Sequence, residues 1–98
     1  MKQRINPLVA EDLKAIRDSI AEDIASKASE IVQEVYEQLE NIQRFPYLGT
    51  DLSKRVSFKT DYKYVVWKND IVLYKIGKET VDIYRVINRY QDITRIFD

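Results

Sequence analysis

The clearest pattern along the chain is an alternation of apolar and polar positions in its second half. Three runs rich in β-branched and aromatic residues are typical of β-strands: 62–67, 71–76 and 81–88. Asn69-Asp70 separates the first two runs, and Gly77–Thr80 separates the last two; both are turn sequences. Loops this short require neighbouring strands to be antiparallel, so we predict an antiparallel sheet.

The first half of the chain has apolar residues at helical spacing. Asn6-Pro7 is typical of a helix start, because Asn supplies an N-cap oxygen and Pro at the first helical position gives up no hydrogen bond. An apolar stripe follows in steps of four, three and four: Val9, Leu13, Ile16 and Ile20. We predict a helix from Pro7 to about Glu22, preceded by a short edge strand at Lys2–Ile5.

A second apolar stripe, from Ala28 to Ile42, predicts a second helix. Asp23 is its candidate N-cap, and Pro46 cannot continue it. The short connection makes the two helices an antiparallel hairpin. Four glutamates occupy the opposite face: Glu30, Glu34, Glu37 and Glu40. No opposing His or Asp cluster accompanies them, which favours a solvated face over a metal site.

The segment between Pro46 and the predicted sheet is the least regular. Gly49 and Asp51 indicate a turn, and residues 52–58 fit either a strand or an extended loop. Within it, Lys54 and Arg55 are candidate contacts for an anionic target. The alternative is that these two cations mark a charged edge strand that discourages aggregation.

Composition narrows the possible chemistry. The 98 residues fit one domain, 1–98, with a single modest core. The chain has no Cys and no His, so disulfides, Ser–His or Cys–His catalysis and His-containing zinc sites are excluded. No apolar run approaches the roughly 20 residues that span a bilayer, and the N-terminus does not resemble a secretory signal. We expect a cytoplasmic protein with no metal, no cofactor and no membrane contact.

Charge is unevenly distributed although the formal net charge is zero. Residues 1–48 hold six Lys/Arg and nine Asp/Glu, a net of −3, and residues 49–98 hold ten and seven, a net of +3. This asymmetry indicates either a side that faces an anionic partner or ordinary surface charge.

The last predicted strand contains an arginine among apolar residues. Strict alternation separates two faces: Val81, Ile83, Arg85, Ile87 and Arg89 on one, and Asp82, Tyr84, Val86 and Asn88 on the other. Unpaired burial of a charge is costly, so Arg85 must reach the rim of the sheet or meet an internal partner.

The order of these elements and two segments, Ile71–Ile76 (IVLYKI) and Ile83–Asp92 (IYRVINRYQD), resemble the RelE/ParE superfamily of bacterial toxins. These are the toxin halves of type II toxin–antitoxin pairs, often described as plasmid stabilisation proteins. The resemblance implies an α+β fold in which a short N-terminal strand and an α-helical hairpin pack with a small antiparallel β-sheet. It also implies a cognate antitoxin as partner.

One branch of the superfamily, the RelE-like toxins, cleaves mRNA on the ribosome with several Lys and Arg residues and often a tail Tyr. Lys63 and Arg89 match catalytic positions of that pattern, and Tyr90 could replace the tail Tyr if the tail folds back. Val65 and Ile71 stand where a second Lys and an Arg are expected. Without His, RNA cleavage needs another base, a cation and an acid, and no dense Lys/Arg cluster is visible to supply them.

The other branch, the ParE-like toxins, inhibits DNA gyrase. The run Ile83–Ile87 (IYRVI) followed by Asp92 fits that branch better, although Asn88 stands where His is common. We therefore predict a gyrase-binding toxin, with two alternatives: a ribosome-dependent mRNA endonuclease, or a non-toxic interaction domain. Candidate target-binding residues are Lys54, Arg55, Arg85, Arg89 and Arg95. Candidate antitoxin-binding residues, whose alternative role is structural, are Tyr62, Tyr64, Trp67 and Tyr84.

Overall fold

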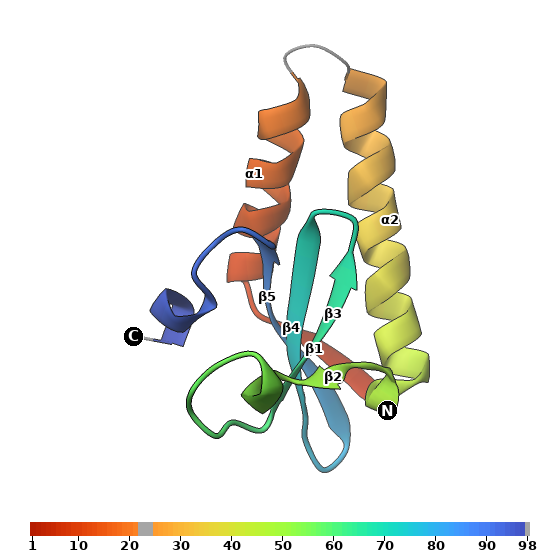
Figure 1. Ribbon diagram of the computed structural model, residues 1–98. Helices are drawn as coiled ribbons and strands as arrows, with labels where there is room; N and C mark the ends of the chain where they lie inside the picture. The colour runs from red at the N-terminus through yellow and green to blue at the C-terminus, as the bar shows by residue number, and fades with distance from the viewer. Residues whose placement is uncertain (22–24, 98) are drawn as a thin grey trace.

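Two antiparallel helices lie across one face of a five-stranded sheet in the computed structural model, which describes residues 1–21 and 25–97 (Figure 1). Helix α1 covers Leu8–Ala21 and helix α2 covers Ala25–Arg44. As predicted, Asn6 caps α1: its side-chain oxygen accepts a hydrogen bond from the Leu8 N–H at 3.0 Å. The expected helix end at Glu22 and the N-cap at Asp23 lie outside the described residues. No described helix is long and apolar enough to cross a membrane.

The sheet has the strand order β1-β5-β4-β3-β2. Its strands are β1 Lys2–Ile5, β2 Thr50–Asp51, β3 Tyr62–Trp67, β4 Asp70–Ile76 and β5 Thr80–Asn88. The antiparallel β3–β4–β5 meander was predicted correctly. β1, however, pairs in parallel with β5, so the sheet is mixed and not purely antiparallel. Along the chain, β1 and β5 are separated by a long connection that includes both helices, and a parallel pair needs such a long crossover.

Both faces of the sheet are covered, by different parts of the chain. The helices pack on one face, where the buried residues are Val9, Leu13, Val35, Leu39, Ile42, Val72, Tyr74, Val81, Ile83 and Val86. The opposite face, which we call the tail face, has a second buried cluster of Leu52, Ile71, Leu73, Ile87 and Ile93. The C-terminal segment forms a 3₁₀ helix at Ile93–Phe97 that contributes to this second cluster. Coverage on both faces explains why β4 carries an unbroken apolar run.

A β-bulge in β5 changes which side chains face the helices. Leu73 lies opposite Arg85 but Tyr74 lies opposite Ile83, so Tyr84 is the extra residue. The predicted alternation is therefore wrong after Tyr84: Val86 returns to the helix-side core, and Ile87 joins the tail face. One inserted residue reverses a period-two pattern, and the sequence carries no Gly or Pro there to signal it.

The irregular segment after β2 is not a strand. Leu52–Lys54 forms a 3₁₀ turn, capped by the Asp51 carboxylate, which accepts a hydrogen bond from the Ser53 N–H at 2.9 Å. The Ser53 hydroxyl then closes the loop by bonding the backbone C=O and N–H of Thr60 at 3.1 and 3.0 Å. The charged-edge-strand interpretation of Lys54 and Arg55 is therefore wrong, and these cations lie on a loop.

Candidate target-binding surface

Arg85 meets an internal partner, which was one of its two expected outcomes. Its Nε and Nη2 donate hydrogen bonds of 2.8 and 2.7 Å to the two carboxylate oxygens of Asp12 on α1. Asp12 also accepts the Val86 N–H at 3.0 Å, just beyond the point where β1 stops pairing with β5. The hydrogen bond to Asp12 raises the pKa of Arg85, so the guanidinium remains charged. The ion pair of Arg85 with Asp12 therefore connects α1 to the sheet.

The RelE-like catalytic interpretation names three residues, and the structure places Lys63 apart from Arg89 and Tyr90. Lys63 lies opposite Tyr74 on the helix side of the sheet. Arg89 follows β5 and its Nη1 donates to the Lys68 carbonyl at 3.3 Å, beside the β3–β4 turn. Lys63 is four residues before Trp67, the last residue of β3, so it is about 13 Å from that turn along the strand. Tyr90 is 80% exposed, and the Arg89 guanidinium lies 5.8 Å from the centre of its ring.

The C-terminal segment folds back over the tail face, but it brings a phenylalanine and not a tyrosine. The ring of Phe97 lies 5.2 Å from Tyr62, 5.5 Å from Tyr84 and 5.9 Å from Phe58. The Tyr84 hydroxyl also donates to the Ile96 carbonyl at 3.3 Å. We call Phe58, Tyr62, Tyr84 and Phe97 the aromatic cluster. It joins the loop after β2, strands β3 and β5, and the tail on one face.

The other two predicted aromatic anchors lie further along β3. Tyr64 packs on the tail-face core, and the Arg55 guanidinium lies 5.4 Å from the centre of its ring. Trp67 donates from its indole N–H to Glu34 on α2 at 3.2 Å. All four predicted anchors thus make intramolecular contacts, and each residue remains half-buried, so part of each is at the surface.

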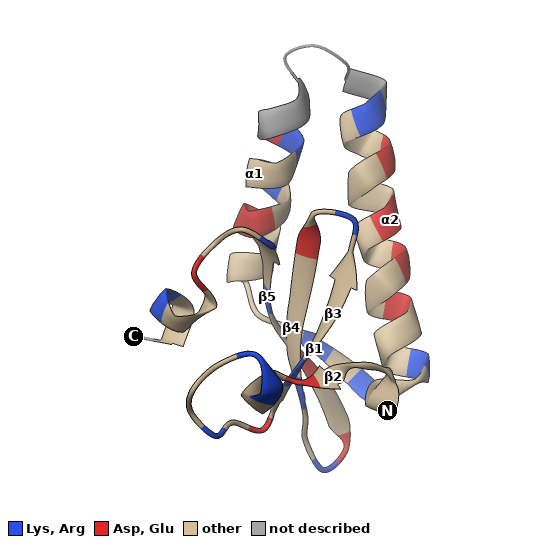
Figure 2. Cartoon of the chain, viewed as in Figure 1, with Lys and Arg blue, Asp and Glu red and all other residues tan. Residues whose placement is uncertain are grey.

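Cations border the tail face, while the helices are acidic (Figure 2). The helices, at 8–21 and 25–44, carry four Lys/Arg and seven Asp/Glu, a net of −3. Residues 45–97 carry ten and six, a net of +4. Lys54 and Arg55 lie on the loop that reaches the tail through Phe58 and Phe97. Arg95 is exposed on the tail itself, with its Nε 3.9 Å from Asp92.

No metal centre is found in the part of the chain that the structure describes: no group of three or more His, Cys, Asp or Glu could hold an ion there. The glutamate row on α2 faces solvent at Glu30, Glu37 and Glu40, as predicted. Glu34 differs, because it forms an ion pair of 2.8 Å with Lys68 as well as its bond to Trp67. These two bonds lower the pKa of Glu34.

The structure also gathers residues that carry no signal of a site in the sequence. Arg4, Lys75 and Asp82 come from three different strands and line one pocket on the tail face. Their meeting depends on the parallel pairing of β1, which residue periodicity could not reveal.

Comparison with known proteins identifies the family. The family model described as "ParE toxin of type II toxin-antitoxin system, parDE" matches residues 4–93. Among solved structures, a chain of the chromosomal ParDE TA system from P. aeruginosa matches with a TM-score of 0.76 and 21% identity, covering 90% of this chain and 95% of that chain. At this identity the structural likeness shows the fold alone. No significant match was found among curated proteins.

The matched region begins within β1 and ends at Ile93, so it includes both helices and all of the sheet except the first two residues of β1. The predicted resemblance to the RelE/ParE superfamily, and to its ParE-like branch, is confirmed. The chain belongs to the ParE toxin family of type II toxin–antitoxin systems.

Proposed function

We propose that this protein is a toxin that arrests growth by binding DNA gyrase and that it does not cleave RNA. The observation that carries this proposal is the separation of the residues at the RelE-like catalytic positions, because Lys63 lies far from Arg89 and Tyr90. Lys63 lies on the helix side of β3, whereas Arg89 and Tyr90 lie beyond the far end of that strand. General acid–base chemistry requires groups within hydrogen-bond reach of one substrate, which this spacing does not provide.

The two substituted positions support the same proposal. Ile71 is fully buried in the tail-face core, and Val65 packs against the helix-side core. A Lys or Arg at Ile71 would place an unpaired charge in that core at high cost. The departures from the RelE-like pattern are therefore part of how this chain packs, and they remove two of the cations that RNA cleavage would use.

The surface best suited to a protein target is the tail face with its cationic border. Aromatic residues and arginine are enriched where interfaces contribute most of their binding energy. We assign target binding to Lys54, Arg55, Arg89 and Arg95, and we assign Arg85 a supporting role through its pairing with Asp12. The net charge of +4 over residues 45–97 favours an anionic partner surface.

The same proposal includes a cognate antitoxin in the cytoplasm, where gyrase acts. The similar solved structure is described as a chromosomal ParDE TA system, and the matching family model is described as the toxin of a type II toxin-antitoxin system. The half-buried aromatics Tyr62, Tyr64, Trp67 and Tyr84 are the candidate contacts for that partner. A toxin–antitoxin pair of this kind would also account for a role in plasmid stabilisation.

The test is plasmid supercoiling by purified gyrase with increasing amounts of this protein. We expect loss of supercoiling together with trapped, cleaved DNA. Arg89→Ala should weaken inhibition, and Lys27→Ala, which removes an exposed cation from α2, should not. Unchanged supercoiling, together with cleavage of ribosome-bound mRNA that Arg89→Ala abolishes, would contradict the proposal and support the endonuclease alternative.

A further inference from the structure

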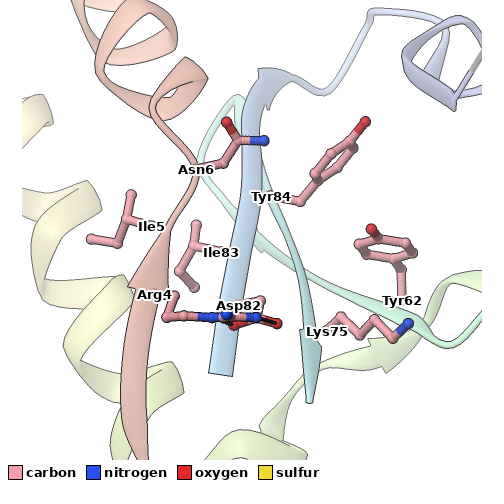
Figure 3. A pocket seen from close by; sticks show the side chains of 8 residues that line it. All are labelled: Arg4, Ile5, Asn6, Tyr62, Lys75, Asp82, Ile83 and Tyr84. Atoms are coloured by element: carbon pink, nitrogen blue, oxygen red, sulfur yellow. Dashed lines mark hydrogen bonds and ion pairs between the residues drawn. The ribbon is translucent and has the colours of Figure 1, made fainter. Parts of the chain in front are cut away.

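One part of the tail face is left uncovered by the C-terminal segment, and it forms a pocket (Figure 3). Strand register places four of its residues in a single row across the sheet: Tyr62 opposite Lys75, Lys75 opposite Asp82, and Asp82 beside Arg4. Tyr84 and Asn6 close the other end of the pocket, whose volume is about 250 Å³.

The charges in this row are unequal. Arg4 donates two hydrogen bonds, of 2.8 and 2.9 Å, to the Asp82 carboxylate, so these two groups largely neutralise each other. Lys75 adds a second cation beside Asp82, and its Nζ lies 5.9 Å from the centre of the Tyr62 ring. The Arg4 hydrogen bonds, with a smaller contribution from Lys75, lower the pKa of Asp82. The pocket therefore carries one more positive than negative charge.

We propose that this pocket binds an acidic side chain on an extended segment of the protein target, as a second contact beside the cationic border. This inference rests on the proposed function. Lys75 supplies the charge that an incoming carboxylate needs, and the Tyr62 and Tyr84 rings supply flat apolar walls for the neighbouring residue. The volume suits one or two side chains and not a whole folded element.

The Asp82 carboxylate favours a protein over a nucleic acid as the occupant of the pocket. Its carboxylate lies in the middle of the row, between the two cations. A phosphate backbone would bring a negative charge every few ångströms past this carboxylate, and each like-charge approach is unfavourable. A peptide with a single acidic residue can direct its charge to Lys75 and avoid Asp82.

The pocket is also linked to the tail. Tyr62 and Tyr84 line the pocket, and both rings also contact the ring of Phe97. A target that binds the tail near Arg95 would therefore lie next to the pocket, because the aromatic cluster connects the tail to the pocket. Two adjacent contacts on one rigid surface increase affinity more than either does alone.

The experiment measures the affinity of this protein for purified gyrase in the absence of DNA. Lys75→Glu reverses the charge in the pocket, and we expect affinity to fall about tenfold or more. Lys78→Glu is the matched control, because it makes the same charge change at an exposed position in the β4–β5 turn, outside the pocket lining. We expect its affinity to change by less than about twofold.

A gain of affinity gives a test that misfolding cannot imitate. Asp82→Asn removes the central anion and frees Arg4, so we expect this variant to bind gyrase about threefold more tightly. Equal losses for Lys75→Glu and Lys78→Glu, or weaker binding by Asp82→Asn in a variant whose thermal unfolding is normal, would overturn the pocket assignment. Tight binding of a single-stranded DNA oligonucleotide that Lys75→Glu abolishes would overturn it in favour of a nucleic acid.

These outcomes separate the two proposals. If the wild-type protein binds gyrase and the pocket variants behave like the control, the assignment of the pocket to target binding is wrong and the gyrase proposal stands. If the wild-type protein does not bind gyrase, the proposed function fails, and the pocket assignment fails with it.

Discussion

We expect Asp12→Ala to remove a large fraction of the free energy of unfolding, because the Asp12 carboxylate accepts three hydrogen bonds. Asp12 accepts two hydrogen bonds from Arg85 and one from the Val86 backbone N–H, and its side chain is only 9% exposed. Removing it leaves Arg85, whose side chain is 26% exposed, without its ion-pair partner, and the Val86 N–H without its acceptor. The ion pair between α1 and β5 is lost in the same step, while their apolar packing remains.

The size of the effect follows from these contacts. Breaking one side of a buried ion pair costs about 3–5 kcal/mol, and the partial exposure of Arg85 places this case near the lower limit, about 3 kcal/mol. A domain of this size loses roughly 4–8 °C of melting temperature per kcal/mol, so we expect a decrease of roughly 12–24 °C. Urea denaturation followed by circular dichroism measures the free energy of unfolding directly.

Asp18→Ala is the matched control on the same helix. The Asp18 side chain is 61% exposed and its carboxylate lies 3.9 Å from Nε of Arg17, which is also exposed, so its removal should change stability by less than about 0.5 kcal/mol. In a double-mutant cycle, Asp12→Ala with Arg85→Ala should cost clearly less than the sum of the two single changes. Equal stabilities for the Asp12 and Asp18 variants would refute the structural role of the pair.

Three further changes test other parts of the structure. Tyr74→Phe removes a buried hydroxyl that donates to the Pro46 carbonyl at 2.7 Å and accepts the Gly49 N–H at 2.8 Å; urea denaturation should show a loss of about 1–3 kcal/mol. Burial raises the pKa of Asp70 above its ordinary value, so the fold favours the protonated form and wild-type stability should fall as pH rises through that raised pKa. Asp70→Asn should remove this pH-dependent loss of stability, so we expect the variant to be more stable than wild type near neutral pH. A wild type that is more stable than the variant at that pH would contradict the raised pKa of Asp70. Phe97→Ala should release the tail, seen as faster amide exchange at 93–97 with little change in β4, whereas unchanged exchange would show that Phe97 does not hold the tail.

The elements with strong local signals were predictable from the sequence. β3 begins and ends where its aromatic and β-branched run does, and Asn6-Pro7 starts α1 where capping chemistry places it. Both are decided within a few neighbouring residues. The segment after β2 has no such pattern, and its shape is set by Ser53 and Thr60, two polar residues that meet only after the loop closes.

Contacts between distant parts of the chain were not predictable in the same way. The need for an internal partner of Arg85 followed from the sequence, but the identity of Asp12 depends on how α1 crosses the sheet, 73 residues away in the chain. The β-bulge at Tyr84 reversed a face assignment because the pairing of β4 with β5 is set by packing on both faces. The pocket was missed for a related reason, since Arg4 reaches Asp82 only through the parallel pairing of β1.

The most direct test of the central claim is the stoichiometry of gyrase inhibition. A toxin that acts by binding inhibits supercoiling only when its concentration becomes comparable to that of gyrase or to the dissociation constant, and the inhibition ends when the toxin is removed. We expect this behaviour when gyrase is titrated with the purified protein. No inhibition at a large excess over gyrase, together with mRNA cleavage at concentrations far below that of ribosomes, would show turnover and contradict the claim that this protein acts by binding.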